Sequence, residues 1–267
     1  MSHRDLQNRV LIITGASAGI GRETALLFAR ERCRLVLAAR RQDRLESLLA
    51  EIKSLGGEAV SLPIDVSDQD QVEHLVRATA ERFGRLDILV NNAGYGLFAT
   101  VEDTTVGELQ SIFATNFAGP FYAIKAALPI MRRQRYGHII NVSSIAGKRA
   151  FPFSGAYCAT KFAMNGLTES LRTELMGSGI DVSLVLPIGT NTEFFAVAKN
   201  KSARPAKPLG IVQSAQQVAE AIVKCAKNPK AEVLPYPPSR VLILLNSISP
   251  RLVDWVGAKL VHRSQRK

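Results

Sequence analysis

The sequence predicts an α/β fold: a doubly wound parallel sheet of about seven strands with helices on both faces. Two observations lead to this prediction. Short, uniformly apolar runs rich in Val, Ile and Leu recur along the chain, as expected of parallel strands that are covered on both faces. Longer amphipathic stretches separate these runs at the spacing of strand–helix units. Because 267 residues suit one large α/β domain, we expect a single domain over residues 1–267.

The predicted strands begin close to the N-terminus and continue into the last quarter of the chain. They are Val10–Thr14, Leu35–Ala39, Ala59–Ile64, Ile88–Asn91, His138–Val142, Val182–Leu186 and Glu232–Leu234. Helical patterns lie between them, for example at Glu23–Glu31, Arg44–Leu55, Asp70–Arg82 and Ala156–Met176. No internal repeat or low-complexity linker interrupts the alternation.

Two segments depart from this alternation. Residues 190–212 mix Phe194 and Phe195 with Lys, Pro and Ala, and we interpret them as an insertion that forms a lid over the substrate. From about 236 to 267 we expect a basic, helical C-terminal extension. Within it, Ser249-Pro250 is typical of an N-cap followed by the first residue of a helix.

The formal net charge of +11 is concentrated in the last quarter of the chain. Residues 1–194 hold 21 basic and 20 acidic side chains, whereas residues 195–267 hold 13 basic and 3 acidic ones. A strongly basic chain raises the hypothesis of nucleic-acid binding, but no basic motif interleaved with aromatic residues supports it. We therefore expect no nucleic-acid partner.

Composition excludes several other classes of protein. A hydrophobic content of 46% with 21% charged residues is too apolar for a disordered chain. The three cysteines lie far apart and the four histidines lack the spacing of metal ligands, so we expect neither a disulfide framework nor a metal site. We find no targeting segment and no apolar run long enough to span a membrane, and we expect a cytoplasmic protein.

A glycine-rich turn follows the first predicted strand. Gly15, Gly19 and Gly21 lie where this strand meets the next helix, so the backbone can approach a pyrophosphate closely. The N-terminus of that helix supplies free N–H groups and a positive dipole. A glycine triplet alone also fits a simple tight turn, but its position at the first strand–helix junction favours a dinucleotide site.

The end of the second predicted strand favours NADP over NAD. NAD enzymes commonly place a carboxylate there for the ribose 2′-hydroxyl, but this chain has Ala39 followed by Arg40 and Arg41. A carboxylate would repel a 2′-phosphate, whereas an arginine binds it through bidentate, charge-assisted hydrogen bonds. We assign this role to Arg40 first, because it follows the strand directly, with solvated surface arginines as the alternative.

A second chemical motif lies in the middle of the chain. Tyr157 and Lys161 are four residues apart and share one face of a helix, and Ser144 precedes Tyr157 by thirteen residues. A phenol is a poor base at neutral pH, but a nearby ammonium stabilises the phenolate and lowers its pKa. A serine hydroxyl could hold a substrate oxygen.

Together these motifs resemble the short-chain dehydrogenases/reductases, in their compact single-domain branch with a Rossmann-like fold. The resemblance covers nearly all of residues 9–235 and is specific, because several motifs occur in the family's order. Its marks are TGASAGIG at 14–21, Asp65-Val66, Asn91-Asn92-Ala93-Gly94, Asn116, Ser144 and YCATK at 157–161.

The resemblance implies an NADP(H)-dependent oxidoreductase that interconverts a carbonyl and a secondary alcohol. It implies that Tyr157 is the general acid/base, that Lys161 lowers its pKa and binds the nicotinamide ribose, that Ser144 positions the substrate oxygen, and that Asn116 holds a water for proton relay. The cofactor contacts that we expect are Gly15, Ser17, Ala18, Gly19, Ile20, Gly21, Arg22, Arg40, Arg41, Asp65, Val66, Asn92, Ala93, Gly94, Tyr157, Lys161, Pro187, Thr190 and Thr192.

The chain departs from the family pattern after the sixth strand. The family usually has Pro-Gly and then a threonine four residues on. Here Pro187 and Thr192 keep the spacing, but Ile188 replaces the glycine. Either Gly189 takes over the turn, or the loop follows a different path, which affects the expected contacts to the nicotinamide carboxamide.

The sequence leaves other functions and the substrate open. The main alternative is a catalytically silent NADP(H)-binding scaffold or redox sensor, although such proteins usually lose the tyrosine or the lysine. The phenylalanines expected near the site indicate an apolar substrate such as a lipid, steroid or aromatic ketone, or else they only pack the lid and core. They are Phe98, Phe151, Phe153, Phe194 and Phe195.

We also expect partners of two kinds. The resemblance implies a homodimer or homotetramer through the helices around 116–134 and 156–176. In the extension, Leu252, Val253, Val256 and Leu260 recur at helical spacing beside basic residues. This pattern fits a helix on an anionic membrane surface, one packed on a partner subunit, or a solvated helix on its own domain.

Overall fold

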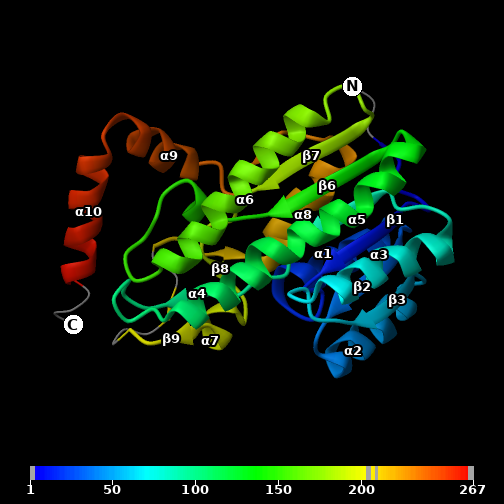
Figure 1. The fold of residues 1–267 in the computed structure, drawn as a ribbon, viewed down its shortest axis with the longest axis horizontal. Coiled ribbons are helices and arrows are strands. Elements are labelled where there is room, and N and C mark those ends of the chain that lie inside the picture. Colours follow the sequence, from blue (N-terminus) through cyan, green and yellow to red (C-terminus); the bar gives the residue numbers. More distant parts are fainter. Residues whose placement is uncertain (1–3, 203–205, 208–209, 264–267) are drawn as a thin grey trace.

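Seven parallel strands form the central sheet in the residues described by the computed structural model, which are 4–202, 206–207 and 210–263. The sheet order is β11-β7-β6-β4-β1-β2-β3 (Figure 1). These strands are β1 (Val10–Thr14), β2 (Arg34–Ala39), β3 (Glu58–Pro63), β4 (Ile88–Asn91), β6 (Gly137–Val142), β7 (Ile180–Val185) and β11 (Glu232–Val233). Every predicted strand is present to within two residues at either end, and the predicted doubly wound α/β fold is confirmed.

Helices cover both faces of the sheet because successive strand residues point to opposite sides. Leu11 and Ile13 of β1 join the hydrophobic core under α1 (Gly19–Arg30), α2 (Gln42–Ser54) and α8 (Ala215–Lys227). Ile12, between them, joins the core under α3 (Gln69–Phe83), α5 (Gly119–Gln134) and α6 (Gly155–Glu174). The uniformly apolar strands in the sequence therefore reflect burial on two sides.

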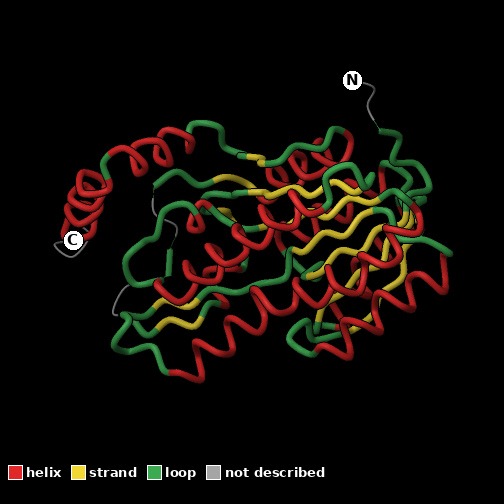
Figure 2. Tube along the Cα trace, turned by 45° about the horizontal axis from the view of Figure 1, so that its top comes forward, coloured by secondary structure: helices red, strands yellow, loops and turns green. Residues whose placement is uncertain are grey.

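The remaining elements extend the molecule beyond the carboxyl ends of the strands, as Figures 1 and 2 both show. They are β5 (Leu97–Phe98), α4 (Val106–Phe113), the π-helical turn η1 (Ala114–Ala118), the 3₁₀ turn η2 (Ile145–Gly147), β8 (Thr190–Asn191), α7 (Phe194–Val197), β9 (Lys199–Asn200), β10 (Gln213–Ser214), α9 (Ser239–Ile248) and α10 (Pro250–Arg263). As predicted from Ser249-Pro250, a helix begins at Pro250.

The segment over residues 190–212 is anchored at several points. Its β8 pairs with β10, which directly follows the segment. Its β9 pairs with β5, which lies in the loop after β4. The Lys201 ammonium donates to the carbonyl of Asp103 at 2.6 Å and lies 3.1 Å from the Glu108 carboxylate. These contacts hold the segment against the loop that follows β4.

Two hydrogen-bond networks, one buried and one partly buried, join neighbouring elements at the carboxyl ends of the central strands. Asn91 at the end of β4 donates to the Asn141 side chain of β6 at 2.8 Å, and Asn141 donates to Thr168 of α6 at 2.9 Å. The Thr14 hydroxyl at the end of β1 accepts hydrogen bonds from the backbone N–H groups of Asn92 and Ala93 at 3.0 and 3.1 Å. The Asn92 amide in turn donates to the carbonyls of Thr14 and Gly15.

The second network lies at the point where the sheet order reverses. From β1 the chain continues to β2 on one side, whereas β4 lies on the other. In open α/β sheets, ligands bind in the crevice outside the carboxyl ends at such a point. The hydrogen bonds of Thr14 and Asn92 therefore join the two loops that border this crevice.

We predict that Thr14→Val lowers the free energy of unfolding by about 1 to 3 kcal/mol, because it removes the acceptor of two backbone N–H groups. Urea denaturation would measure the change. Thr14→Ser keeps the hydroxyl and is the matched control, expected to lose about 1 kcal/mol or less for the missing methyl group. Equal stability of the valine variant and wild type would contradict this role.

Candidate active site

The loop between β1 and α1 has no room for side chains at its glycines. Gly15 has φ +66°, and a Cβ there would lie 2.8 Å from the Cα of Ala93. Gly19 has φ +54°, and its Cβ would lie 2.9 Å from the Thr192 methyl group. At Gly21, a Cβ would collide with the carbonyl of Gly15. The three glycines thus allow one close turn that touches the loops after β4 and β7.

The N-terminus of α1 faces the cavity that this turn helps to line. Ala18, which precedes the helix, provides no side-chain cap, and the first turn contains no acidic residue. Ala18, Gly19 and Ile20 line the cavity. Neither the N-cap side chain nor an acidic side chain of the first turn therefore offsets the positive end of the helix dipole at the cavity.

The two arginines after β2 both line the cavity but differ in their partners. Arg40 has a side chain that is 75% exposed, with one guanidinium nitrogen 3.9 Å from the Asp65 carboxylate. Arg41 donates to the Ser17 hydroxyl in the glycine turn at 3.2 Å and to Glu193 at 2.7 Å. Arg41 therefore contacts the glycine turn, whereas the partner of Arg40 is Asp65, although the sequence favours Arg40 for the phosphate.

Glu193 is a residue that the sequence analysis missed. Its carboxylate accepts from Arg41 and lies 3.8 Å from Arg44, although both arginines are far away in the sequence. The hydrogen bond from Arg41 is the main reason that the pKa of Glu193 is below its usual value. The side chain is therefore an anion at neutral pH, placed on an arginine expected to bind phosphate.

Of three further residues expected to contact the cofactor, two line the cavity and one does not. Val66 and Asp65 line the cavity, and the Asp65 carboxylate caps the following turn by accepting from the Ser67 backbone and hydroxyl. Arg22 is not among the cavity-lining residues, because its guanidinium pairs with Glu51 on α2 and lies 3.7 Å from Glu23. Its expected contact with the phosphate end finds no support in this arrangement.

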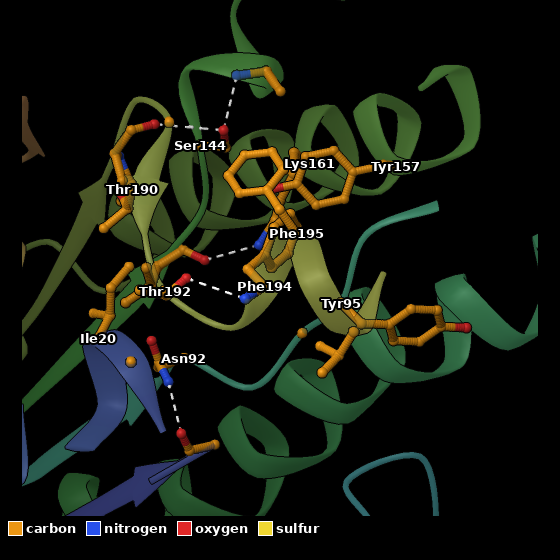
Figure 3. A pocket seen from close by; sticks show the side chains of 18 of the residues that line it. Ile20, Asn92, Tyr95, Ser144, Tyr157, Lys161, Thr190, Thr192, Phe194 and Phe195 are labelled. Carbon is orange, nitrogen blue, oxygen red and sulfur yellow. Dashed lines mark hydrogen bonds between the residues drawn. The ribbon is translucent and has the colours of Figure 1, made fainter. Parts of the chain in front are cut away.

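Tyr157, Ser144 and Lys161 come together on the other side of the same cavity (Figure 3). Ser144 follows β6, and its hydroxyl accepts from the Ala146 N–H at 3.0 Å. Burial raises the pKa of Tyr157 above its usual value, and a hydrogen bond with Ser144 opposes this rise. Tyr157 is therefore protonated at neutral pH.

Lys161 lies deeper than Tyr157. Its ammonium donates to the carbonyl of Val142 at 3.0 Å and lies 5.8 Å from the centre of the Tyr157 ring. Burial lowers the pKa of Lys161 to about 8. The sequence predicts that Lys161 lowers the pKa of Tyr157, but in this arrangement burial dominates both groups and disfavours both charged forms.

The backbone around Lys161 is tightly packed. The Ser143 hydroxyl donates to the Asn165 side chain at 2.7 Å, and Asn165 donates to the carbonyl of Gly147 at 2.9 Å. A Cβ at Gly147 would lie 2.7 Å from the carbonyl of Lys161. The sequence did not indicate these contacts. They hold α6 against η2 and so fix the positions of Tyr157 and Lys161 relative to the end of β6.

Asn116 occupies the π-helical turn η1, a distortion often found at functional sites. Its buried side chain accepts from the Tyr95 N–H and donates to the Tyr95 carbonyl, both at 3.0 Å. It also donates to the Thr160 hydroxyl at 3.3 Å. These direct contacts tie the loop after β4 to α6, and Asn116 itself is not among the residues that line the cavity.

The loop with Ile188 is held at several carbonyls. Pro187 accepts from the Ile145 N–H and Gly189 from the Gln213 N–H, each at 2.9 Å. The Thr190 hydroxyl donates to the carbonyl of Ile188. Pro187, Ile188, Thr190 and Thr192 all line the cavity, so the replacement of the usual glycine leaves these side chains at the site.

Aromatic side chains cover the cavity over Tyr157. The Phe194 ring lies edge-to-face on the Tyr157 ring at 5.5 Å, and Phe195 stacks on Phe98 at 5.9 Å. Figure 3 shows Phe194 and Phe195 beside Tyr157 and Lys161. All five phenylalanines singled out from the sequence line the cavity, whose volume is about 860 Å³.

The C-terminal extension also contributes to the cavity, which the sequence analysis did not predict. Tyr236, Ser239 and Leu242 line it. Their signal in the sequence is weak, because they come from the first turn of α9 and the loop before it.

Cys158, beside Tyr157, is buried against Ser154 and the Phe151 backbone.

Comparisons with known proteins identify a family model and several relatives that match this chain. The model of the short chain dehydrogenase family matches residues 9–203. The uncharacterized oxidoreductase YxnA of Bacillus subtilis is 34% identical over 98% of this chain and 75% of its own length. The ketoacyl reductase HetN of a Nostoc species is 32% identical over 94% of this chain and 90% of its own length.

Two solved structures share the fold. A short-chain dehydrogenase/reductase from Burkholderia phymatum, in complex with NAD, superposes with a TM-score of 0.85 at 27% identity, covering 93% of this chain and 96% of that one. An alcohol dehydrogenase from the archaeon Thermococcus sibiricus, in complex with 5-hydroxy-NADP, gives a TM-score of 0.75 at 29% identity over 85% and 96% of the two chains.

The low pKa of Lys161 makes stability depend on pH. Between pH 8 and the ordinary lysine value of 10.5, native Lys161 is neutral while the unfolded chain binds a proton. The free energy of unfolding should therefore rise with pH across this window, by about 1 kcal/mol per unit, and should show no such slope below it.

Urea denaturation of wild type and Lys161→Met over about pH 7 to 10 would isolate this contribution, because the variant lacks the titrating group. The difference between the two proteins should be constant up to about pH 8 and then grow in favour of wild type. A difference that does not change with pH would show that native Lys161 keeps its ordinary pKa.

Proposed function

Because this chain belongs to the short-chain dehydrogenase/reductase family, we propose that it is an NADP(H)-dependent oxidoreductase interconverting a carbonyl and a secondary alcohol. One observation carries the proposal: the glycine turn, the two arginines and the Ser144–Tyr157–Lys161 group all line one cavity. Its volume of about 860 Å³ falls in the range of small-molecule sites. The name of the Nostoc relative, a ketoacyl reductase, also fits a carbonyl substrate.

The residues present fit a dinucleotide. The glycines let the backbone of this turn pass close to a bound pyrophosphate, because a side chain at any of them would collide with neighbouring atoms. The N-terminus of α1, which has no side-chain cap, also suits a pyrophosphate. Arg40 and Arg41 would hold the 2′-phosphate, Asp65 and Val66 the adenine, and Asn92 to Gly94 the adenosine side. Lys161, Pro187, Thr190 and Thr192 would hold the nicotinamide end. When bound, NADPH supplies the hydride that reduces the carbonyl carbon.

The chain's own residues manage the oxygen and the proton. Ser144 holds the carbonyl oxygen, and Tyr157, which is protonated at neutral pH, donates its proton to that oxygen as negative charge develops on it. The ammonium of Lys161 then stabilises the phenolate that remains. Asn116 positions α6 relative to the loop after β4 through its hydrogen bonds to Tyr95 and Thr160. It also holds a water through which the proton of Tyr157 is replaced from solvent.

The lid segment excludes water from this step. Phe194 covers the Tyr157 ring, and the apolar lining favours a carbonyl on an apolar molecule. A protonated tyrosine is suited to reduction, since the proton is in place before the reaction begins.

We predict that Tyr157→Phe lowers kcat by a hundredfold or more, about the contribution of one general acid, while the Kd for NADPH stays nearly unchanged. Loss of NADPH absorbance with a panel of carbonyls, and titration calorimetry, would measure the two quantities. Tyr122→Phe on α5 is the matched control. Normal turnover in Tyr157→Phe would refute the mechanism, and NADPH binding without turnover in wild type would support the scaffold alternative.

The arginine pair should determine the preference for NADPH. Replacing Arg40 or Arg41 by Ala should weaken NADPH binding by about tenfold or more and change NADH binding little, because only NADPH has the 2′-phosphate. Arg30→Ala, an exposed arginine at the far end of α1, is the control for net charge. Glu193→Gln should tighten NADPH binding, because it removes the anion on Arg41.

Calorimetric titration with both cofactors would measure these effects. Wild type that binds NADH more tightly than NADPH would overturn the assignment of the cofactor. An equal loss for both cofactors in Arg41→Ala would show that this side chain only supports the glycine turn.

A further inference from the structure

The outer face of α9 is a continuous apolar stripe. Val241, Leu244, Leu245 and Ile248 recur at helical spacing, and they are 59%, 54%, 45% and 81% exposed. Figures 1 and 2 place α9 and α10 at one end of the molecule, beyond the sheet. Four large apolar side chains in one exposed row are unusual for a surface that faces only water.

The next helix continues the pattern. On α10, Leu252, Trp255 and Val256 lie at the same spacing and are 51%, 56% and 43% exposed. The Lys259 ammonium lies 3.5 Å from the centre of the Trp255 ring. Such a residue set, with apolar side chains, a tryptophan and a lysine beside it, suits the boundary between lipid tails and headgroups. We name these seven apolar residues the α9–α10 surface.

Charge distinguishes between the possible occupants of this surface. The chain from Pro237 to its end contains six basic residues and one acidic residue, Asp254. Asp254 is already paired, since Arg149 donates to it at 2.6 Å. The exposed Arg240, Arg251 and Lys259 therefore leave the α9–α10 surface positively charged.

We propose that the α9–α10 surface binds an anionic membrane, with both helices lying in the plane of the headgroups. Its apolar side chains enter the boundary of the acyl chains, and its basic side chains contact the anionic headgroups. Among the described residues, no helix has the length and apolar character needed to cross a bilayer, so the contact is peripheral.

A second copy of the chain fits this surface less well. A two-fold contact places the same patch of each subunit against the other, which would bring two positive surfaces together. The anionic membrane instead complements both the charge and the apolar stripe.

The position of α9 connects this surface with the cavity. Leu242 lines the cavity, whereas Val241 and Leu244, within two residues of it on the same helix, are exposed. On the membrane, the cavity would therefore lie beside the lipid phase. This consequence rests on the proposed function, and it assigns the substrate to apolar carbonyls or alcohols dissolved in the bilayer.

Co-sedimentation of the full chain with vesicles tests the membrane contact directly. Vesicles of equimolar phosphatidylcholine and phosphatidylglycerol should bind wild type, and vesicles of phosphatidylcholine alone should bind it much more weakly. The variant Leu244→Ser/Ile248→Ser/Trp255→Ser should bind at least about tenfold more weakly, because three exposed apolar contacts are lost. The matched control, Val101→Ser/Val106→Ser/Met176→Ser, changes exposed apolar residues that lie outside the cavity lining and outside α9 and α10, and it should bind like wild type.

Trp255 provides a second measurement, because it is the only tryptophan in the chain. Its fluorescence should shift to shorter wavelength on addition of the anionic vesicles, and brominated lipids should quench it. Unchanged fluorescence, equal binding of the triple variant and wild type, or equal binding to both kinds of vesicle would overturn the proposal. A wild type that ignores vesicles but forms an oligomer that the triple variant cannot form would assign the surface to a second copy.

The test is separable from the proposed function. Turnover of a water-soluble carbonyl with NADPH should be the same in wild type and the triple variant, since none of the three residues lines the cavity. Vesicle binding without turnover in any protein would refute the proposed function alone, and turnover without vesicle binding would refute the membrane contact alone.

Discussion

The rest of the site depends on the hydrogen bonds that connect the carboxyl ends of β1 and β4. The hydroxyl of Thr14 and the amide of Asn92 close four hydrogen bonds between the glycine turn and the loop after β4. A parallel sheet brings these two ends together, but their loops leave toward opposite helical layers. These hydrogen bonds hold the loop after β4 against Gly15, where a Cβ would lie 2.8 Å from the Cα of Ala93.

Burial then gives the two halves of the cavity different chemistry. Near the glycine turn, the N-terminus of α1 and two arginines create a positive, partly exposed region suited to phosphates. Around Tyr157, burial raises the pKa of the phenol and lowers that of Lys161, so the charged form of each side chain is disfavoured.

The sequence was sufficient for those features that depend on local patterns. Apolar runs located all seven strands, and the glycine turn and the Tyr157–Lys161 spacing located two sides of the cavity. Features that depend on distant pairing were not accessible. Glu193 meets Arg41 across 152 residues, Arg22 is held by Glu51 on another helix, and Leu242 reaches the cavity from the extension. The effect of burial on Lys161 also required the packing of α6 against η2.

A crystal structure of the full chain grown with NADP⁺ tests the central claim most directly, namely that one cavity holds the dinucleotide against Tyr157. The account predicts the pyrophosphate at the N-terminus of α1, the 2′-phosphate on Arg40 or Arg41 with Glu193 released, and the nicotinamide beside Tyr157 and Lys161. A dinucleotide bound elsewhere, or one whose 2′-phosphate touches neither arginine while Glu193 stays on Arg41, would contradict it.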